Sequence, residues 1–271
     1  MRLFQLSIEQ LFICLFIIFT VLVGYFVHSL TKTGAIAAAI VGFFVASGFG
    51  INGLLLLGSF FVSSSLLSKF KATQKVSLSQ IVEKGERRDW QQVFANGGVA
   101  AVASLLFFYT ESMLFHMTFL IVVASSNADT WASEIGALSK QKPLTIKGLQ
   151  KVEKGTSGAV SLLGTVAAFL GALFIAIVAL FLFKGIDGKV MIFIMLFGFL
   201  GSVIDTLFGA FLQVTYKCRK CGLITEKKQH CDRETKQISG FSIVNNDVVN
   251  FLSGLIAAAA GSTIYFMSEF I

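Results

Sequence analysis

Long apolar runs separated by short polar stretches dominate the pattern of this chain. A helix needs about 20 apolar residues to cross the hydrocarbon core of a bilayer. Seven runs approach or exceed that length and are predicted as membrane spans, at residues 11–30, 52–68, 91–109, 114–139, 157–183, 188–215 and 243–270. We therefore expect an all-α polytopic membrane protein whose residues 1–271 form a single transmembrane domain.

An eighth apolar stretch, at residues 34–47, is shorter and rich in Gly and Ala. The sequence GFGING follows it, so the stretch is either a short span or one arm of a re-entrant hairpin. Both interpretations return the chain to the same side by residue 69, and both give about eight segments. The first apolar run is too long for a signal-peptide core and no small-residue cleavage site follows it, so we expect a retained helix.

The distribution of charge supports the membrane assignment and predicts an orientation. Only 14% of the residues are charged, whereas soluble domains carry roughly a quarter. Eighteen of the 22 Lys and Arg residues lie in three loops, at 69–90, 140–154 and 216–240. The positive-inside rule places these loops in the cytoplasm and both termini outside. It also explains the net charge of +7, so we expect a multi-pass protein of the cell membrane and no nucleic-acid partner.

Four acidic residues are predicted to lie at one depth in the inner half of the membrane. Asp129 and Glu134 belong to SSNADTWASEIG in the span 114–139. Asp205 belongs to the span 188–215, and Asp247 lies near the start of the span 243–270. One Asp near a helix end often only caps the helix or reaches the interface, but several acids at one depth indicate a functional site. Because Asp129 and Glu134 are five residues apart, a regular helix does not place them on one face. Either the helix breaks near Trp131 or the two acids have different roles.

Further polar residues are expected at the same level, as candidates for binding the substrate or the nucleotide. They are Arg87, Arg88, Asn96, Asn127, Gln213, Asn246 and Asn250. Carboxylates brought together repel one another unless a positive charge compensates them. Mg²⁺ takes hard oxygen ligands and usually bridges to phosphate groups. The pattern therefore predicts a magnesium site on Asp129, Asp205 and Asp247.

The sequence KGTSG, which opens the 157–183 run, is a candidate anion site. Lys154, Gly155, Thr156, Ser157 and Gly158 are expected at a helix N-terminus, where free backbone N–H groups attract phosphate. An ordinary Ser or Thr N-cap is the alternative. The two arginines of the preceding basic loop either contribute phosphate contacts or simply anchor that loop on the cytoplasmic side.

The stretch CRKCGLITEKKQHC in the loop 216–240 resembles a zinc site. Cys218, Cys221, His230 and Cys231 supply four nitrogen or sulfur ligands, which completes a tetrahedron. Cytoplasmic thiols stay reduced, so disulfides are not expected there. The adjacency of His230 and Cys231 is awkward, and one of them could fail to bind. We expect a structural Zn²⁺ rather than a catalytic one.

Several motifs together resemble the integral membrane domain-of-unknown-function ninety-two family, which includes plant phytyl phosphate kinase. They are ANGG, SSNADTWASEIG, VEKGTSGAVSLLGT, GSVIDTLFGAFLQ, the CxxC loop and NNDVVN, and they extend from about Lys84 to Phe251. The resemblance implies a Mg²⁺-dependent kinase at the cytoplasmic face. It would transfer a phosphoryl group from a nucleoside triphosphate, with CTP one candidate, to an isoprenyl monophosphate. Asp129, Glu134, Asp205 and Asp247 would be its catalytic residues.

Two other functions fit the same pattern. A lipid-phosphate cytidylyltransferase would use the same site to transfer a nucleotidyl group. A transporter or flippase of a lipid or an anionic solute often carries acids near the membrane midplane on discontinuous helices. The outer halves of the predicted spans are almost purely apolar, which argues against transport because a path across the membrane needs polar groups at both faces.

Overall fold

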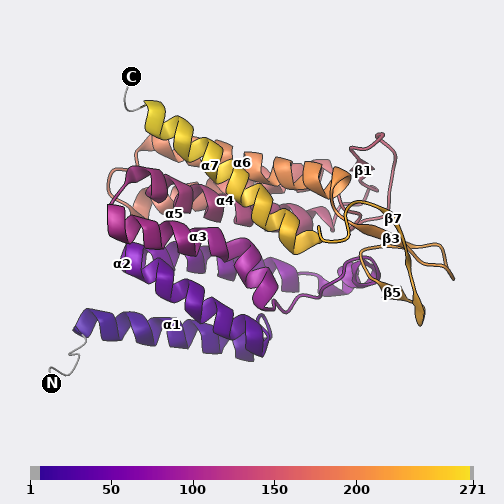
Figure 1. Cartoon of the computed structure of the whole chain (residues 1–271), viewed down its shortest axis with the longest axis horizontal. Helices are drawn as coiled ribbons and strands as arrows, with labels where there is room; N and C mark the ends of the chain where they lie inside the picture. The colour runs from indigo at the N-terminus through magenta and orange to yellow at the C-terminus, as the bar shows by residue number, and fades with distance from the viewer. Residues whose placement is uncertain (1–6, 269–271) are drawn as a thin grey trace.

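The computed structural model describes residues 7–268, with side chains for 7–75 and 78–268, and Figure 1 shows a bundle of long helices. The helices are α1 (Ile8–Phe26), α2 (Lys32–Lys69), the 3₁₀ helix η1 (Ala72–Gln80), α3 (Trp90–Thr110), α4 (Met113–Gly136), α5 (Leu162–Leu182), α6 (Gly188–Phe211) and α7 (Asn246–Ser268). The strands are β1 (Leu144–Thr145), β2 (Ala159–Val160), β3 (Thr215–Lys217), β4 (Ile224–Thr225), β5 (Gln229–His230), β6 (Arg233–Glu234) and β7 (Lys236–Ser239). The strands are confined to loops, which confirms an all-α membrane class.

Helix α2 is a hairpin of two arms rather than one long rod. Gly50 interrupts the helix with φ 56° and ψ −145°, a conformation open mainly to glycine. The first arm, 32–49, is about 27 Å long at 1.5 Å per residue, and Phe49 at its end stacks on Phe107 near the end of α3. The second arm returns, because Lys69 donates a hydrogen bond to the carbonyl of Val27. Residues 34–47 therefore belong to a full-length arm, and the bundle has eight segments.

The three basic loops lie at one end of the bundle and the described chain ends at the other. Figure 1 shows the strands and η1 gathered at one end, opposite the start of α1 and the end of α7. This arrangement agrees with the expected even number of spans between successive basic loops. We refer to the loop side as the basic end.

Helix α4 lies at the centre of the bundle. It packs against α2, α3, α5, α6 and α7, and Met117, Phe119 and Ala128 on it are fully buried. The other six α-helices of the described chain are long and apolar enough to cross a membrane by composition. Because those helices shield α4 from lipid, its second half can carry polar side chains at little cost. Helix α1 is the opposite case, since it lies at the edge of the bundle with mostly exposed side chains.

Two helix boundaries differ from the sequence prediction at the basic end. Helix α5 starts at Leu162, where the Ser161 hydroxyl accepts a hydrogen bond from the Gly164 N–H at 3.1 Å. The 155–158 turn thus precedes β2 and is not a helix N-terminus, which corrects the expectation. Helix α6 ends at Phe211, so Gln213 lies in the following loop.

Candidate functional site

A cavity of about 550 Å³ opens at the basic end, between α4, α6, α7 and the loops that connect them. Most of the predicted site residues line it. They are Arg88, Asn96, Asp129, Glu134, Lys154, Gly155, Thr156, Ser157, Gly158, Asp205, Gln213, Asn246, Asp247 and Asn250. The tertiary structure therefore gathers residues that are separated by up to 162 positions along the chain into one polar space within a membrane protein.

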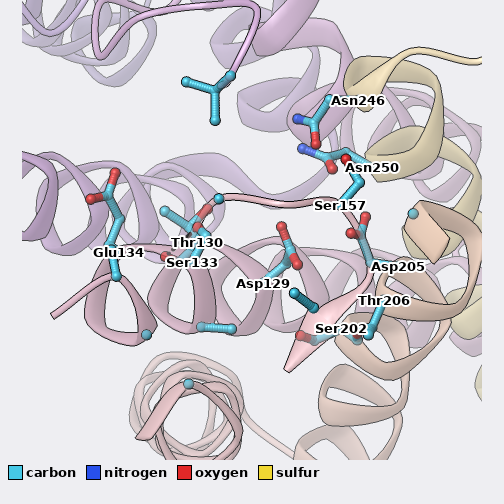
Figure 2. Close-up of a pocket in the computed structure, with 18 of the residues that line it drawn as sticks. Asp129, Thr130, Ser133, Glu134, Ser157, Ser202, Asp205, Thr206, Asn246 and Asn250 are labelled. Carbon is cyan, nitrogen blue, oxygen red and sulfur yellow. Dashed lines mark hydrogen bonds between the residues drawn. The ribbon is translucent and has the colours of Figure 1, made fainter. Parts of the chain in front are cut away.

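Asp129 and Asp205 form the centre of this cavity. Figure 2 shows both carboxylates directed into the same space, from α4 and α6, and they are close enough to share a hydrogen bond. Asp205 Oδ2 also accepts from Ser253 Oγ at 3.1 Å and from the Asn250 amide at 3.0 Å. In the described part of the chain, no basic side chain lies within 4.0 Å of either carboxylate. Two carboxylates this close both stay ionised only if a cation lies between them; otherwise one of them is protonated.

Glu134 lies farther along α4 and has its own basic partner. Its Oε2 is 2.5 Å from Lys75 Nζ, and its Oε1 accepts a hydrogen bond from Ser68 at 2.5 Å. The helix continues unbroken past Trp131 to Gly136, so the two acids of SSNADTWASEIG have different surroundings. Glu134 is a neutralised carboxylate that fastens η1 and α2 to α4, and its catalytic role stays a prediction.

Asp247 is likewise neutralised, by Lys84. The lysine Nζ lies 2.5 Å from Asp247 Oδ2 and 2.8 Å from Asp89 Oδ2. Burial lowers the pKa of Lys84, but its hydrogen bonds to Asp247 and Asp89 outweigh that effect and raise the pKa above its usual value. Among the described residues, Asp129, Asp205 and Asp247 do not form a group with oxygens close enough for one ion. The expected centre of three carboxylates is therefore not formed, because Asp247 lies apart from the Asp129–Asp205 pair, and Mg²⁺ binding itself stays a prediction.

The two neighbouring arginines have different positions. Arg87 donates to the carbonyl of Leu30 at 3.0 Å and fastens the turn between α1 and α2, outside the cavity. Arg88 lines the cavity, where it donates to Ser65 Oγ at 2.9 Å and lies over the ring of Phe61. Burial lowers the pKa of Arg88 from its usual value, but a guanidinium has so high a pKa that it stays a cation at neutral pH.

Arg88 also lines a second, apolar cavity of about 100 Å³. We call this second cavity the apolar groove; it lies between α1, α2 and α3. Its walls include Phe16, Ile17, Val41, Leu54, Leu57, Gly58, Phe60 and Phe61. Arg88, Gln92 and Asn96 line both the polar cavity and the groove. The polar and apolar spaces therefore meet at these three residues.

A half-buried carboxylate that sequence reasoning missed, Glu226, closes the loop side of the polar cavity. It accepts hydrogen bonds from Ser157 Oγ at 2.7 Å and from Gln213 Nε2 at 2.8 Å. Burial raises the pKa of Glu226 above its usual value. The sequence offered one signal that could have identified Glu226 as a site residue: it is the single acid between residues 217 and 231. Gly158 brings Ser157 into place, because its φ is 70° and an added Cβ would lie 2.4 Å from Ala210 of α6.

Asn127 does not reach the cavity. It is fully buried within the bundle, where it donates to the Gly171 carbonyl at 2.7 Å and accepts from Ser63 at 3.0 Å. These contacts tie α4 to α5 and to the second arm of α2, so the expected nucleotide contact of Asn127 is corrected to helix packing. Asn96, by contrast, lies at the junction of the cavity and the groove.

The four residues of the zinc-like loop come together outside the cavity. The ligand atoms of Cys218, Cys221, His230 and Cys231 all lie within 4.8 Å of one another. Among the described residues this is the one group of three or more such side chains with that spacing. Both members of the adjacent His230–Cys231 pair belong to the group.

Comparison with known proteins agrees with the architecture. The family model of the integral membrane protein DUF92 matches residues 15–258. Protein PGR of Arabidopsis thaliana is 31% identical over 256 residues, which cover 84% of this chain and 87% of that protein. Uncharacterized membrane protein MJ0933 of Methanocaldococcus jannaschii is 29% identical, covering 87% and 86%. Protein VTE6, chloroplastic, of Arabidopsis thaliana is 27% identical, covering 84% and 62%. No solved structure matches. The chain belongs to the integral membrane DUF92 family.

Proposed function

We propose that this protein is an isoprenyl phosphate kinase, which transfers the terminal phosphoryl group of a nucleoside triphosphate to a lipid monophosphate. Membership in the DUF92 family, with VTE6 among the relatives, suggests a role related to prenyl phosphates. The kinase reaction, the nucleotide and the lipid are our proposal. CTP is one candidate donor, as the motif resemblance implies.

The observation that carries the proposal is the junction of the polar cavity and the apolar groove at Arg88, Gln92 and Asn96. An isoprenyl monophosphate has an anionic head and a branched hydrocarbon tail, so it needs adjoining spaces of both kinds. Arg88 can hold two phosphate oxygens at once through its planar guanidinium. The groove lies between helices that face lipid, which allows the tail to enter sideways from the membrane.

The carboxylate pair fits the cation that a phosphotransferase needs. Asp129 and Asp205 lie within hydrogen-bond reach of each other, with no basic partner among the described side chains, and the Asn250 amide lies beside them. The carboxylate oxygens of the pair are hard ligands that match Mg²⁺. Asp129 and Asp205 would hold the ion, which supplies charge neutralisation for the donor phosphates when bound. The other residues of the cavity bind and orient the two substrates.

Each remaining group has a part that follows from its position. Arg88 would hold the lipid phosphate so that one of its oxygens faces the terminal phosphorus of the nucleotide. Lys154 and the 155–158 turn would hold the donor phosphates across the cavity. The lipid oxygen forms the new P–O bond, the bond to the bridging oxygen breaks, and the nucleoside diphosphate leaves. A phosphate oxygen is already anionic at neutral pH, so this transfer needs no strong general base.

The orientation is also part of the proposal. The positive-inside rule places the basic end in the cytoplasm, where nucleoside triphosphates are available. Lys75 and Lys84 neutralise Glu134 and Asp247 at the walls. Among the described side chains, the Asp129–Asp205 pair then has no basic partner within 4.0 Å, which favours a bound cation together with polyphosphate.

The test uses purified protein in lipid nanodiscs with an isoprenyl monophosphate and each nucleoside triphosphate, labelled at the α or the γ phosphate. We expect label from the γ position in an isoprenyl diphosphate, and no transfer without Mg²⁺. Asp129→Asn and Asp205→Asn should each reduce the rate by about 100-fold or more, since they remove charge that is required in the transition state.

Asp187→Asn is the matched control. Asp187 caps α6 at the opposite end of the bundle by accepting from the Lys189 and Val190 N–H groups at 2.9 Å, and Asn caps a helix equally well. This variant should keep full activity. Label that arrives from the α phosphate would instead indicate a cytidylyltransferase-type reaction, and full activity of a folded Asp205→Asn variant would refute the assigned site.

A further inference from the structure

The loop between β3 and β6 brings three thiols and one imidazole to a common centre. Nδ1 of His230 lies 3.5 Å from the Cys221 sulfur and 3.2 Å from the Cys231 sulfur, and all four ligand atoms lie within 4.8 Å of one another. A tetrahedral zinc site with Zn–S bonds of about 2.3 Å has edges of about 3.8 Å. The group therefore needs only a small contraction to surround one ion.

A left-handed turn explains how adjacent residues 230 and 231 face the same centre. Successive side chains of an extended strand point to opposite faces. The β5–β6 hairpin turns at Cys231 and Asp232, whose φ values are 53° and 59°. Two positive φ values are typical of a type I′ hairpin turn, and this turn directs the Cys231 side chain back beside the His230 ring. A non-glycine residue such as Cys231 occupies this conformation at a cost, which indicates a functional reason for it.

Around Cys218, backbone N–H groups are placed to stabilise a thiolate. The N–H groups of Lys220 and Cys221 donate to the Cys218 sulfur at 3.4 and 3.5 Å. Gly222 then turns the chain with a φ of 76°. Hydrogen bonds of this kind orient metal ligands and stabilise their charge. Three thiolates and one neutral imidazole around Zn²⁺ carry a net charge of −1, and the segment is rich in cations that compensate it: Lys217, Arg219, Lys220, Lys227 and Lys228.

The residues between the two halves of the cluster reach the polar cavity. Thr225 Oγ1 donates to the Ile81 carbonyl at 2.8 Å, and the Glu226 N–H donates to the same carbonyl at 2.8 Å. Glu226 then enters the cavity wall, where it meets Ser157 and Gln213. The loop buries few apolar side chains of its own, so a crosslink at its base determines how firmly residues 224–226 are held.

We infer that Cys218, Cys221, His230 and Cys231 bind one structural Zn²⁺, and that this ion holds Glu226 in the wall of the polar cavity. The site has four protein ligands and no open position, as structural zinc sites do. Zinc binding releases the thiol protons to solvent and involves no redox step. The inference does not depend on the proposed kinase activity.

The test is metal analysis of the full-length protein purified from zinc-supplied cells without chelator. The wild type should carry about one Zn²⁺ per chain, released when the thiols are blocked by a mercurial reagent. Cys221→Ser and His230→Ala should each lose most of the metal. Cys14→Ser is the matched control, because Cys14 is a free thiol in α1 far from the cluster, and it should keep the full amount.

Two further measurements keep the inference falsifiable if a ligand variant fails to fold. Wild-type protein loaded with Co²⁺ should show thiolate-to-cobalt charge transfer and the strong visible bands of tetrahedral cobalt. Removal of zinc should also increase amide hydrogen exchange at residues 224–226 while leaving the Asn52 region, at the opposite end of the bundle, unchanged. Wild-type protein without zinc, a disulfide between two of the three cysteines, or an octahedral cobalt spectrum would overturn the inference.

Discussion

The contact between Gly158 and α6 gives a prediction whose size can be worked out from the structure. An alanine Cβ at position 158 would lie 2.4 Å from the Ala210 backbone and its Cβ, and the residue would keep a φ of 70°. The left-handed backbone costs an L-residue roughly 1–2 kcal/mol. Forcing a methyl group into a packed contact costs about 1–3 kcal/mol more.

Gly185 separates these two contributions. Its φ is 87°, and an added Cβ there would have nothing within 4 Å. Gly185→Ala should therefore carry the backbone cost alone, whereas Gly158→Ala carries the backbone cost and the steric one. One kcal/mol corresponds to about 2–4 °C in Tm for a chain of this size, so a steric cost of about 1–3 kcal/mol should make Gly158→Ala unfold about 2–12 °C below Gly185→Ala.

The assay is the apparent Tm of each variant in nanodiscs, followed by loss of the monodisperse peak on size-exclusion chromatography. Kinase turnover measured on the same samples should fall for Gly158→Ala only, because a displaced turn moves Ser157 away from Glu226. Equal Tm values for the two variants would show that the 155–158 turn is not clamped against α6. The description of the cavity wall would then be wrong.

Three other predictions concern the walls around the carboxylate pair. Lys75→Met and Glu134→Gln should each destabilise the fold by about 3 kcal/mol, since each leaves a buried charge unpaired, and the double variant should recover most of that loss in a double-mutant cycle of Tm values. Asn127→Ala should lower the Tm through loss of its two hydrogen bonds while leaving the KM for nucleotide unchanged, and a raised KM would contradict its packing role. Gly58→Phe should fill the apolar groove, where a Cβ meets nothing within 4 Å, and lower kcat/KM for long isoprenyl chains more than for short ones.

The sequence by itself determined the class, the number of segments and the relation between the loops. Apolar runs of membrane-spanning length and clustered Lys and Arg residues are local properties of the chain, and the bilayer converts them directly into helices and sidedness. For the same reason the depth of Asp129 and Asp205 could be predicted. Their depth follows from their distance from the basic loop at the end of the same span.

Lateral contacts could not be predicted in the same way. Hydropathy places a residue along the membrane normal but says little about which helix lies beside it, so it could not show that Lys75 and Lys84 neutralise Glu134 and Asp247. It also gave no reason to place Asn127 inside the bundle. Partner choice depends on shape and hydrogen bonding between helices, which are properties of the packed bundle.

The tertiary structure alone decided which of the four predicted acids form the centre of the cavity and which are paired with lysines in its walls. Only packing of α4 against α6 brings Asp129 to Asp205, and only the folded 216–240 loop carries Glu226 into the cavity. A single left-handed turn at Cys231 makes two adjacent residues share one centre. These outcomes depend on backbone geometry and close packing between distant segments, whereas the class of the protein needed only the order of its apolar and charged residues.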